Sequence, residues 1–392
     1  MSVLGKKWLI RGQDQSKSAF EKVLENRGLI NFTELSDFHD PFLFADMYKA
    51  VERIQKAVSL NERIIVFGDY DVDGITAAAI LIHALKKLGA NVSYRLPNRV
   101  TDGYGLSEKF IDEFIEKKID LVITVDCGIS CFNEVAKASQ HGIDVIITDH
   151  HTLPENLPAA HAILHPKAHN SSYPFSELTG AGVALKLAQA LIKQEDFLNS
   201  LLDLATLGTV ADLGALVGEN RLIVKRGLEV LANTRWHGLK RLKYLANIKD
   251  GDRIDPIKIG FQLAPRINAA GRIGDPYMAL QLLLQEDESE RTVQLGDHLE
   301  ALNRQRQDLT EKALKQIEDF LAGQENLSSI IIAHDPNWHV GILGLIAGRV
   351  AEKYGRPAIM LQDLGDTLVA SARSPQNFNI IETLSEFKHH LI

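Results

Sequence analysis

Three aspartates stand at alternate positions in one short stretch of the sequence, and their spacing predicts a site for a cation. Asp69, Asp71 and Asp73 lie between a predicted strand, the apolar run 64–67, and an alanine-rich helix that opens at Gly74. Carboxylates this close repel one another and raise one another's pKa. Helix capping accounts for one or two of the three aspartates. A bound divalent cation is the simplest compensation for all three.

The elements that must position these aspartates alternate between strand and helix. Apolar runs and helical spacing predict strands at 63–67, 91–96, 120–125 and 144–148, and helices at 75–88, 107–117 and 130–140. Near-continuous apolar strands joined by helices are typical of a parallel sheet that is covered on both faces. The sequence therefore predicts an α/β fold with its functional side chains at the carboxyl ends of the strands.

Two further strand ends carry side chains that bind metals. The predicted strand 120–125 runs into Asp126, and the strand 144–148 runs into Asp149, His150 and His151. A single aspartate after a strand is usually a cap or turn residue. A lone histidine is usually an ordinary surface or core side chain. Because these side chains join the three aspartates at one predicted edge, the pattern favours a metal site over the structural interpretations.

Further candidates follow the predicted sheet. Asp212 ends an apolar helical run, where an unpaired buried carboxylate is costly, and it is a candidate further ligand. Asp203 lies in the same context and is interpreted as helix-exposed or hydrogen-bonded. The stretch 152–177 is rich in proline and histidine and is interpreted as a loop. Its histidines are irregularly spaced and are not expected to be ligands, with His165 the strongest exception.

The composition is that of an ordinary globular protein. Of 392 residues, 45% are hydrophobic and 24% are charged, which is enough chain for two or more domains. The formal charge of −8 argues against a protein that coats nucleic acid non-specifically, although metal-binding carboxylates enter that sum. Cys127 and Cys131 are the only cysteines, and they predict free thiols in a reducing cytosol. We expect no secretory signal, no membrane association and a cytoplasmic location, because no sufficiently long apolar run is present.

Cationic side chains gather in two later stretches. Residues 221–249 carry eight lysines and arginines against one glutamate, which fits a solvated helical face or, alternatively, a surface that tracks phosphates. Residues 256–274 are punctuated by glycine and are interpreted as a turn. On that turn Arg266, Asn268 and Arg272 suit phosphate binding, and ordinary turn chemistry is the alternative.

The sequence of the last third of the chain predicts a helix that connects two domains, followed by a second α/β unit. A long helix is expected at about 286–321. Its apolar stripe, which Arg306 interrupts, consists of Leu295, Leu299, Leu302, Leu309, Ile317 and Phe320. Beyond it, short apolar runs and a helix at about 342–354 begin an α/β unit that the remaining residues do not finish.

Seven motifs in order resemble those of a known family. Four of them resemble the signature motifs of the DHH phosphoesterases: GDYDVDG at 68–74, VDCGIS at 125–130, TDHH at 148–151 and LGTVADL at 207–213. Three more are similar to stretches of the single-strand-specific 5′-to-3′ DNA exonucleases in that family: NRVTDGYGLS at 98–107, APRINAAGR at 264–272 and HDPNWHVGILG at 334–344.

The resemblance implies a parallel-sheet DHH domain joined by a long helix to a smaller, incomplete α/β DHHA1 domain. The expected divisions are an N-terminal helical cap at 1–60, a DHH catalytic domain at 61–285, a connecting helix at 286–325 and a partial DHHA1 domain at 326–392. Such exonucleases continue past the position of Phe387 to a glycine-glycine-histidine motif and usually to an OB-fold. The sequence ends at Ile392, so we expect a C-terminally shortened member.

The resemblance also implies two Mn²⁺ or Mg²⁺ ions, and mixed aspartate and histidine ligands suit those metals. Two such ions activate a water and hold a scissile phosphate. The expected ligands are Asp69, Asp71, Asp73, Asp126, His150, His151 and Asp212. Asp71 and Asp126 are the expected bridging or paired ligands, and Asp149 orients a histidine. His151 is assigned to the second ion or to a phosphate oxygen, and Asp71, Asp126 and His151 are the expected catalytic residues.

The expected function is hydrolysis of single-stranded DNA from its 5′ end in repair and recombination. The expected substrate-binding residues are Tyr104, Arg266, Asn268, Arg272, Arg373 and Ser374, with Tyr104 near the terminal nucleotide. A single-strand-binding protein and a helicase are candidate partners, and the chain is expected to be a monomer. The alternatives are a DHH phosphodiesterase of short oligonucleotides or cyclic dinucleotides, and a catalytically impaired truncated form or binding module. A dehydrogenase is excluded, because no G-x-G-x-x-G follows the first strand.

Overall fold

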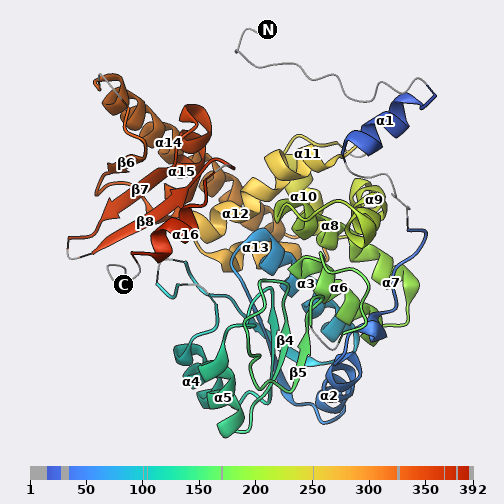
Figure 1. Ribbon diagram of the computed structural model, residues 1–392. Helices are drawn as coiled ribbons and strands as arrows, with labels where there is room; N and C mark the ends of the chain where they lie inside the picture. The colour runs from blue at the N-terminus through green and yellow to red at the C-terminus, as the bar shows by residue number, and fades with distance from the viewer. Residues whose placement is uncertain are drawn as a thin grey trace.

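A computed structural model of the chain describes residues 16–27, 35–99, 101–103, 105–168, 171–249, 251–324, 327–365, 367–376 and 378–387. Within these residues the strands form one sheet of five strands and one of three. All neighbours in the larger sheet are parallel, which confirms the predicted α/β fold class. The larger sheet lies in the lower half of Figure 1, and the smaller one, in red, lies at the left.

The larger sheet has the strand order β2-β1-β3-β4-β5. Its strands are β1 Arg63–Gly68, β2 Asn91–Arg95, β3 Leu121–Val125, β4 Asp144–Thr148 and β5 Ala162–Leu164. The helices that follow β1, β2 and β3 are α3 Val72–Lys87, α4 Glu108–Glu116 and α5 Phe132–Gln140. Because every strand runs in the same direction, the carboxyl ends of β1, β3 and β4 meet at one edge.

Alternate residues of each strand face opposite sides of this sheet, and each side has its own core. Ile64 and Val66 of β1 pack with α2 (Met47–Ser59), α3 and α6 (Gly180–Leu191). Ile65 and Phe67 pack instead with α4 and α5, which lie at the lower left of Figure 1. The helix α3 is buried on all sides because it also contacts α8, Leu202–Ala211.

Helices fill the chain between the two sheets. The remaining ones before the connector are α7 Glu195–Ser200, α9 Gly218–Ala232, α10 His237–Leu245, α11 Pro256–Lys258, the π-helical turn η2 Ile259–Leu263, α12 Ala264–Ile273 and α13 Pro276–Leu283. The predicted long helix is α14, Glu290–Ala322. It packs on α10, α12 and α13, and also on α15 of the C-terminal unit, so it joins the two parts of the molecule.

The C-terminal unit has a separate core. Its elements are β6 Ile331–His334, α15 Val340–Tyr354, β7 Ala358–Asp363, β8 Leu368–Arg373 and α16 Ile380–Ser385. The last turns of α14 supply Ala313, Ile317 and Leu321 to this core. Among the residues that the structure describes, no helix is long and apolar enough to cross a membrane.

Four sequence-based expectations about local structure are wrong. The helix α3 begins at Val72 rather than at 75, because Asp71 accepts the Gly74 N–H and caps it. The stretch 152–177 contains the three-residue strand β5, which is too short to show a periodic pattern. Residues 256–274 are helical rather than a glycine-rich turn. Phe320, placed on the apolar stripe of the long helix, is 54% exposed.

The N-terminal region is only partly as expected. The short helix α1, Ala19–Asn26, contains no buried residue, whereas Met47 and Ile54 of α2 lie in the core of the larger sheet. Between these helices stands one 3₁₀ turn, η1 Pro41–Leu43. The other parts of the predicted cap, 1–15 and 28–34, lie outside the described residues.

Candidate metal centre

The first three aspartates are held at the junction of β1 and α3. Asp71 caps α3 by accepting the N–H of Gly74 at 3.1 Å. Asp73 lies in the first turn of α3 and is buried. It accepts backbone N–H groups from Gly180 at 2.6 Å and Ala181 at 2.9 Å. The first turn of α6 therefore fixes the orientation of one candidate ligand, as helix N-termini do for anions.

Asp126 projects from the end of β3 with an unusual backbone conformation. Its φ angle is 59°, in the left-handed region that aspartate tolerates better than most residues. A Cβ atom at Gly180 would lie 2.5 Å from Asp126 Oδ1, so only glycine allows α6 to approach so closely. The side chain is buried, and Oδ1 has no hydrogen-bond partner among the described residues.

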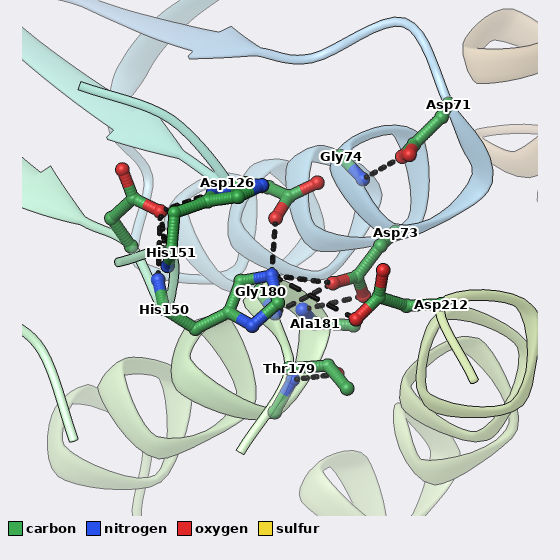
Figure 2. Close-up of polar contacts among 12 residues, drawn as sticks. Asp71, Asp73, Gly74, Asp126, His150, His151, Thr179, Gly180, Ala181 and Asp212 are labelled. Carbon is green, nitrogen blue, oxygen red and sulfur yellow. Dashed lines mark hydrogen bonds and ion pairs between the residues drawn. The ribbon is translucent and has the colours of Figure 1, made fainter. Parts of the chain in front are cut away.

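The two adjacent histidines take different directions at the end of β4. Figure 2 shows the His150 imidazole between Asp126 and the pair Asp73 and Asp212, while His151 lies to the other side. His150 Nε2 is 3.1 Å from Asp126 Oδ1, 3.7 Å from Asp73 Oδ2 and 3.8 Å from Asp212 Oδ2. The contact to Asp126 is close but lacks hydrogen-bond geometry, since neither atom is satisfied. Such an arrangement suits ligands that face a common ion.

Asp149 orients this histidine pair from behind. Its Oδ1 accepts the backbone N–H groups of His150 and His151 and lies 2.7 Å from His151 Nδ1. Its Oδ2 accepts the N–H of Ile129 at 2.9 Å. With a proton on Nδ1, the lone pair of the neutral His151 ring is at Nε2, which is the atom that would bind an ion.

His165 supports the same segment and does not face the cluster. Its ring is fully buried, and Nδ1 accepts the N–H of Lys167 at 3.1 Å. The ring proton is therefore on Nε2, which donates to the carbonyl oxygen of His151 at 2.8 Å. The sequence left His165 as the strongest ligand candidate of its loop, but both of its nitrogens are engaged elsewhere.

Replacing His165 tests this support. We expect His165→Leu to weaken Mn²⁺ binding by about tenfold, the lower end of what outer partners of metal ligands contribute. His165→Gln should retain most of the affinity, because its amide nitrogen can donate to the same carbonyl. Isothermal titration with Mn²⁺ measures both. Equal Mn²⁺ affinity in His165→Leu and the unmodified chain would contradict this role.

The candidate ligands fall into three groups that share members. The groups are Asp126, His150 and His151; Asp73, His150 and Asp212; and Asp69, Asp71 and Asp126. Within each group, one ligand atom from every residue lies within 4.8 Å of the others. Buried atoms without a partner among the described residues include Asp69 Oδ1, Asp126 Oδ1 and His150 Nε2. These unsatisfied atoms and the aspartate and histidine donor set fit divalent cations such as Mn²⁺ or Mg²⁺.

The crowded carboxylates of the cluster also favour a bound cation. Burial, and then the charge of Asp71, raise the pKa of Asp69 to about 7 and that of Asp212 to about 6. Burial and neighbouring carboxylates raise the pKa values of Asp73 and Asp126 well above the usual range. Burial, with the nearby His151, lowers the pKa of His150 to about 4, so this imidazole is neutral at pH 7 and available as a ligand.

Asp203, the other aspartate of the apolar helices, has a structural role. It is buried in α8, where Thr234 Oγ1 donates to Oδ2 at 2.5 Å and the N–H of Leu204 donates to Oδ1. Burial raises the pKa of Asp203 to about 7. Of the two interpretations that the sequence allowed for Asp203, helix-exposed or hydrogen-bonded, the second is therefore correct. Asp203 belongs to none of the three groups of candidate ligands.

The predicted phosphate-binding residues divide into two sets. Arg266 is bound by Glu300 at 2.7 Å and by two backbone carbonyls, so its guanidinium is already engaged. Ser374 donates to the carbonyl of Phe378 at 2.7 Å. Asn268 lies on α12, near Arg266 in sequence. Arg266 and Ser374 thus have partners outside the cluster, the assignment of Asn268 to phosphate stays a prediction, and Tyr104 lies outside the described residues.

Arg272 and Arg373 lie where the two parts of the molecule meet. Arg272 Nη1 donates to the carbonyl of Gly341 at the start of α15, at 3.2 Å. Burial, and then Arg99, lower the pKa of Arg272 to about 10, while the Asp71 charge acts in the opposite direction. Arg306 and Arg373 add to the positive charge around Arg272. A region of positive charge therefore borders the carboxylate cluster.

Sequence reasoning did not identify Arg99 and Arg306 as members of this region. The Arg99 guanidinium stacks 4.3 Å from the ring of Tyr70, which stands between two of the candidate ligands. The Nε atoms of both arginines are buried and have no partner among the described residues. Arg99 lies in a motif that the sequence analysis quoted, so its signal was present. The only sign of Arg306 in the sequence was that it interrupts the apolar stripe of the predicted long helix.

Known proteins share this arrangement of elements. The model of the DHH family, N-terminal domain, matches residues 63–209. The Bacillus subtilis protein named single-stranded-DNA-specific exonuclease RecJ is 41% identical over 364 residues, which are 92% of this chain and 46% of that protein. The RecJ of Dickeya dadantii is 33% identical over 395 residues, 95% of this chain and 68% of the relative. The chain belongs to the RecJ family. The RecJ crystal structure from Thermus thermophilus in complex with Mn²⁺ matches at a TM-score of 0.80 and 31% identity, over 93% of this chain and 53% of that one.

This RecJ-family chain spans about half the length of the Bacillus and Thermus relatives. The matched DHH region contains six of the seven candidate ligands and ends just before Asp212. Asp212 nevertheless lies beside His150, because α8 brings it back to the carboxyl edge of the sheet.

Proposed function

We propose that this chain is a metal-dependent exonuclease that hydrolyses single-stranded DNA from the 5′ end. The observation that carries the proposal is the meeting of seven aspartate and histidine side chains, from three strand ends and α8, in overlapping groups of ligand atoms. The names of the RecJ relatives support the choice of single-stranded DNA as substrate. The Thermus relative, solved in complex with Mn²⁺, supports the choice of metal.

Each residue of the cluster has a distinct part in this proposal. Two Mn²⁺ or Mg²⁺ ions, held by the three groups, would supply a nucleophilic water and neutralise charge on the scissile phosphate. His150 is neutral and presents Nε2 to the carboxylates. Asp149 holds the proton of His151 at Nδ1 and leaves Nε2 toward the site. The N–H groups of α6 hold Asp73 in place without adding a cation.

The arginines that border the cluster bind the phosphates of the DNA backbone in this proposal. Guanidinium groups that have no carboxylate partner are suited to phosphate oxygens. Among the described residues, neither Arg272 nor Arg373 forms an ion pair with a carboxylate, in contrast to Arg266. We therefore assign the phosphates that flank the scissile bond to Arg272 and Arg373, with Arg99 beside them.

The same proposal covers domain organisation and cellular context. We assign residues 61–285 to the catalytic domain, 286–325 to the connecting helix and 326–392 to part of a second domain, with 1–60 before them. We further propose a cytoplasmic monomer in DNA repair and recombination, with a single-strand-binding protein and a helicase as partners. These statements rest on the family resemblance and on the separate core of the C-terminal unit.

A cleavage assay tests the proposed function. We expect the chain, with Mn²⁺, to release mononucleotides from single-stranded DNA of a few tens of nucleotides, and to leave a blunt duplex intact. EDTA should abolish the release. A DNA labelled at its 5′ end should lose its label in the first product, whereas a 3′ label should stay on the shortening strand. Products are measured by gel electrophoresis and chromatography.

Other outcomes separate the alternatives. Cleavage of a dinucleotide alone would indicate a phosphodiesterase of small substrates, which shares every candidate ligand. Mn²⁺ binding without cleavage of any DNA would indicate a binding module or a form that requires further sequence for activity. Cleavage that persists in EDTA would contradict the metal-dependent mechanism.

A further inference from the structure

A cavity of about 490 Å³ opens beside His151, on the α4 and α5 side of the larger sheet. Its walls come from Leu106, from the turn 128–131 after β3, and from Asp149, His151 and Thr152 after β4. The volume is in the range of small-molecule sites, roughly 300 to 1,000 Å³. The strand order 2-1-3-4-5 places ligand sites at the carboxyl edge, where this cavity lies.

The charges that line the cavity argue against phosphate as its occupant. Glu134 and Asp149 contribute carboxylates, and neither lysine nor arginine lines it in the described part of the chain. Asp149 is already occupied by N–H groups from Ile129 and from both histidines. No hydrogen bond or ion pair to Glu134 occurs among the described residues, so its carboxylate is the acceptor that remains for a ligand.

The rest of the lining suits a flat, partly polar group. Leu106 and Ile129 are almost fully buried and provide apolar contact. Ser130 contributes a hydroxyl group. The cavity thus combines apolar walls, a hydroxyl group and one carboxylate acceptor.

We propose that this cavity binds the base of a nucleotide next to the scissile phosphate and prefers bases with an exocyclic amine. The inference rests on the proposed function, because it places a phosphate at His151 and the attached nucleoside behind it. Glu134 accepts from the amine of cytosine, adenine or guanine, as carboxylates do in base recognition. Thymine has no such amine and presents a carbonyl oxygen to the carboxylate.

Binding of nucleotides in the presence of Mn²⁺ tests the cavity. Isothermal titration compares deoxycytidine 5′-monophosphate, thymidine 5′-monophosphate and inorganic phosphate on the whole chain. We expect the cytidine nucleotide to bind about fivefold more tightly than the thymidine nucleotide, the contribution of one hydrogen bond. Ser130→Trp fills the cavity and should weaken both nucleotides about tenfold without changing the phosphate affinity. Ser139→Trp, at the far end of α5, is the matched control and should bind as the unmodified chain does.

A second variant keeps the test decisive if Ser130→Trp fails to fold. Glu134→Gln offers an amide that accepts from an amine or donates to a carbonyl, so it should bring the two nucleotides to equal affinity. Glu116→Gln on α4 is its control. Nucleotides that bind no better than phosphate, or that bind Ser130→Trp normally, overturn the inference. Loss of DNA cleavage with the nucleotide preference intact would instead count against the proposed function alone.

Discussion

Asp126→Asn abolishes Mn²⁺-dependent cleavage of single-stranded DNA while the fold is retained. Asp126 belongs to two of the three ligand groups, so its loss disrupts both. The rate should fall by more than about 100-fold, the upper end of the cost of losing an outer partner of a ligand. Asparagine has the same shape and also tolerates the left-handed backbone at this position. Cleavage rates with saturating Mn²⁺ measure the effect.

The same substitution should make the metal-free chain more stable. Burial and the charges of Asp73 and Asp71 raise the pKa of Asp126, which means that its ionised form destabilises the folded state. Removing that charge therefore raises the thermal midpoint in EDTA, and the gain in midpoint on adding Mn²⁺ becomes smaller. A destabilised variant in EDTA would show that the carboxylate is needed for folding rather than for the metal.

Asp203→Asn is the matched control for this experiment. Asp203 is also buried and also has a raised pKa, of about 7, but it is bound by Thr234 and Leu204 and belongs to none of the ligand groups. Its substitution should leave cleavage and the response to Mn²⁺ unchanged. Retention of cleavage within about tenfold in Asp126→Asn, or its loss in Asp203→Asn, would contradict the assignment of Asp126 as a ligand.

The carboxyl edge of the sheet was predictable because two independent rules converge on it. Strand periodicity located β1, β3 and β4 to within a residue or two. The topology of parallel sheets then placed the residues that follow them together. Asp69, Asp126 and His150 are thus brought together although more than 20 residues separate each from the next. Burial of the strands dictates this geometry, so the order of apolar residues along the sequence carried the information.

Other features depend on contacts that periodicity does not encode. Arg266 and Arg272 belong to one motif, six residues apart on α12. The first pairs with Glu300 of α14, whereas the second reaches Gly341 of α15. Which arginine remains available for phosphate is therefore decided by the packing of α14 and α15, elements distant in the sequence. The prediction of a turn at 256–274 was wrong for a similar reason. Gly271 does not mark a turn there, because its role is to let α12 approach the carbonyl of Tyr70.

Metal-free and metal-loaded chains should respond to pH in opposite directions. In EDTA, we expect the free energy of unfolding to fall as the pH rises from 5 to 8. Asp69 and Asp212 have pKa values of about 7 and about 6 in the folded state, above the ordinary aspartate value. The folded chain therefore holds protons that the unfolded chain has lost, and this stabilisation disappears as the pH passes 6 and then 7. His151, whose pKa Asp149 raises, acts in the same direction.

Two groups must be separated from this effect. His150, with a pKa of about 4, has the opposite effect on the free energy of unfolding below pH 6.5. This single group is outweighed by the several carboxylates whose pKa values are raised. Asp203, with a pKa of about 7, lies outside the cluster and also lowers the free energy of unfolding as the pH rises. Repeating the titration in Asp203→Asn removes that contribution and leaves the slope that belongs to the cluster. The slope should persist there and become shallower in Asp126→Asn.

Mn²⁺ should reverse the trend because it binds deprotonated carboxylates, so its affinity rises with pH. At 100 times its dissociation constant it adds about 2.7 kcal/mol of stability. For domains of this size, that raises the thermal midpoint by about 5 to 10 °C. The gain should be largest at pH 8 and small at pH 5, as followed by calorimetry in EDTA and in excess Mn²⁺. A gain that is independent of pH would show that the bound metal does not displace the protons of Asp69 and Asp212, and the cluster would then not be its site.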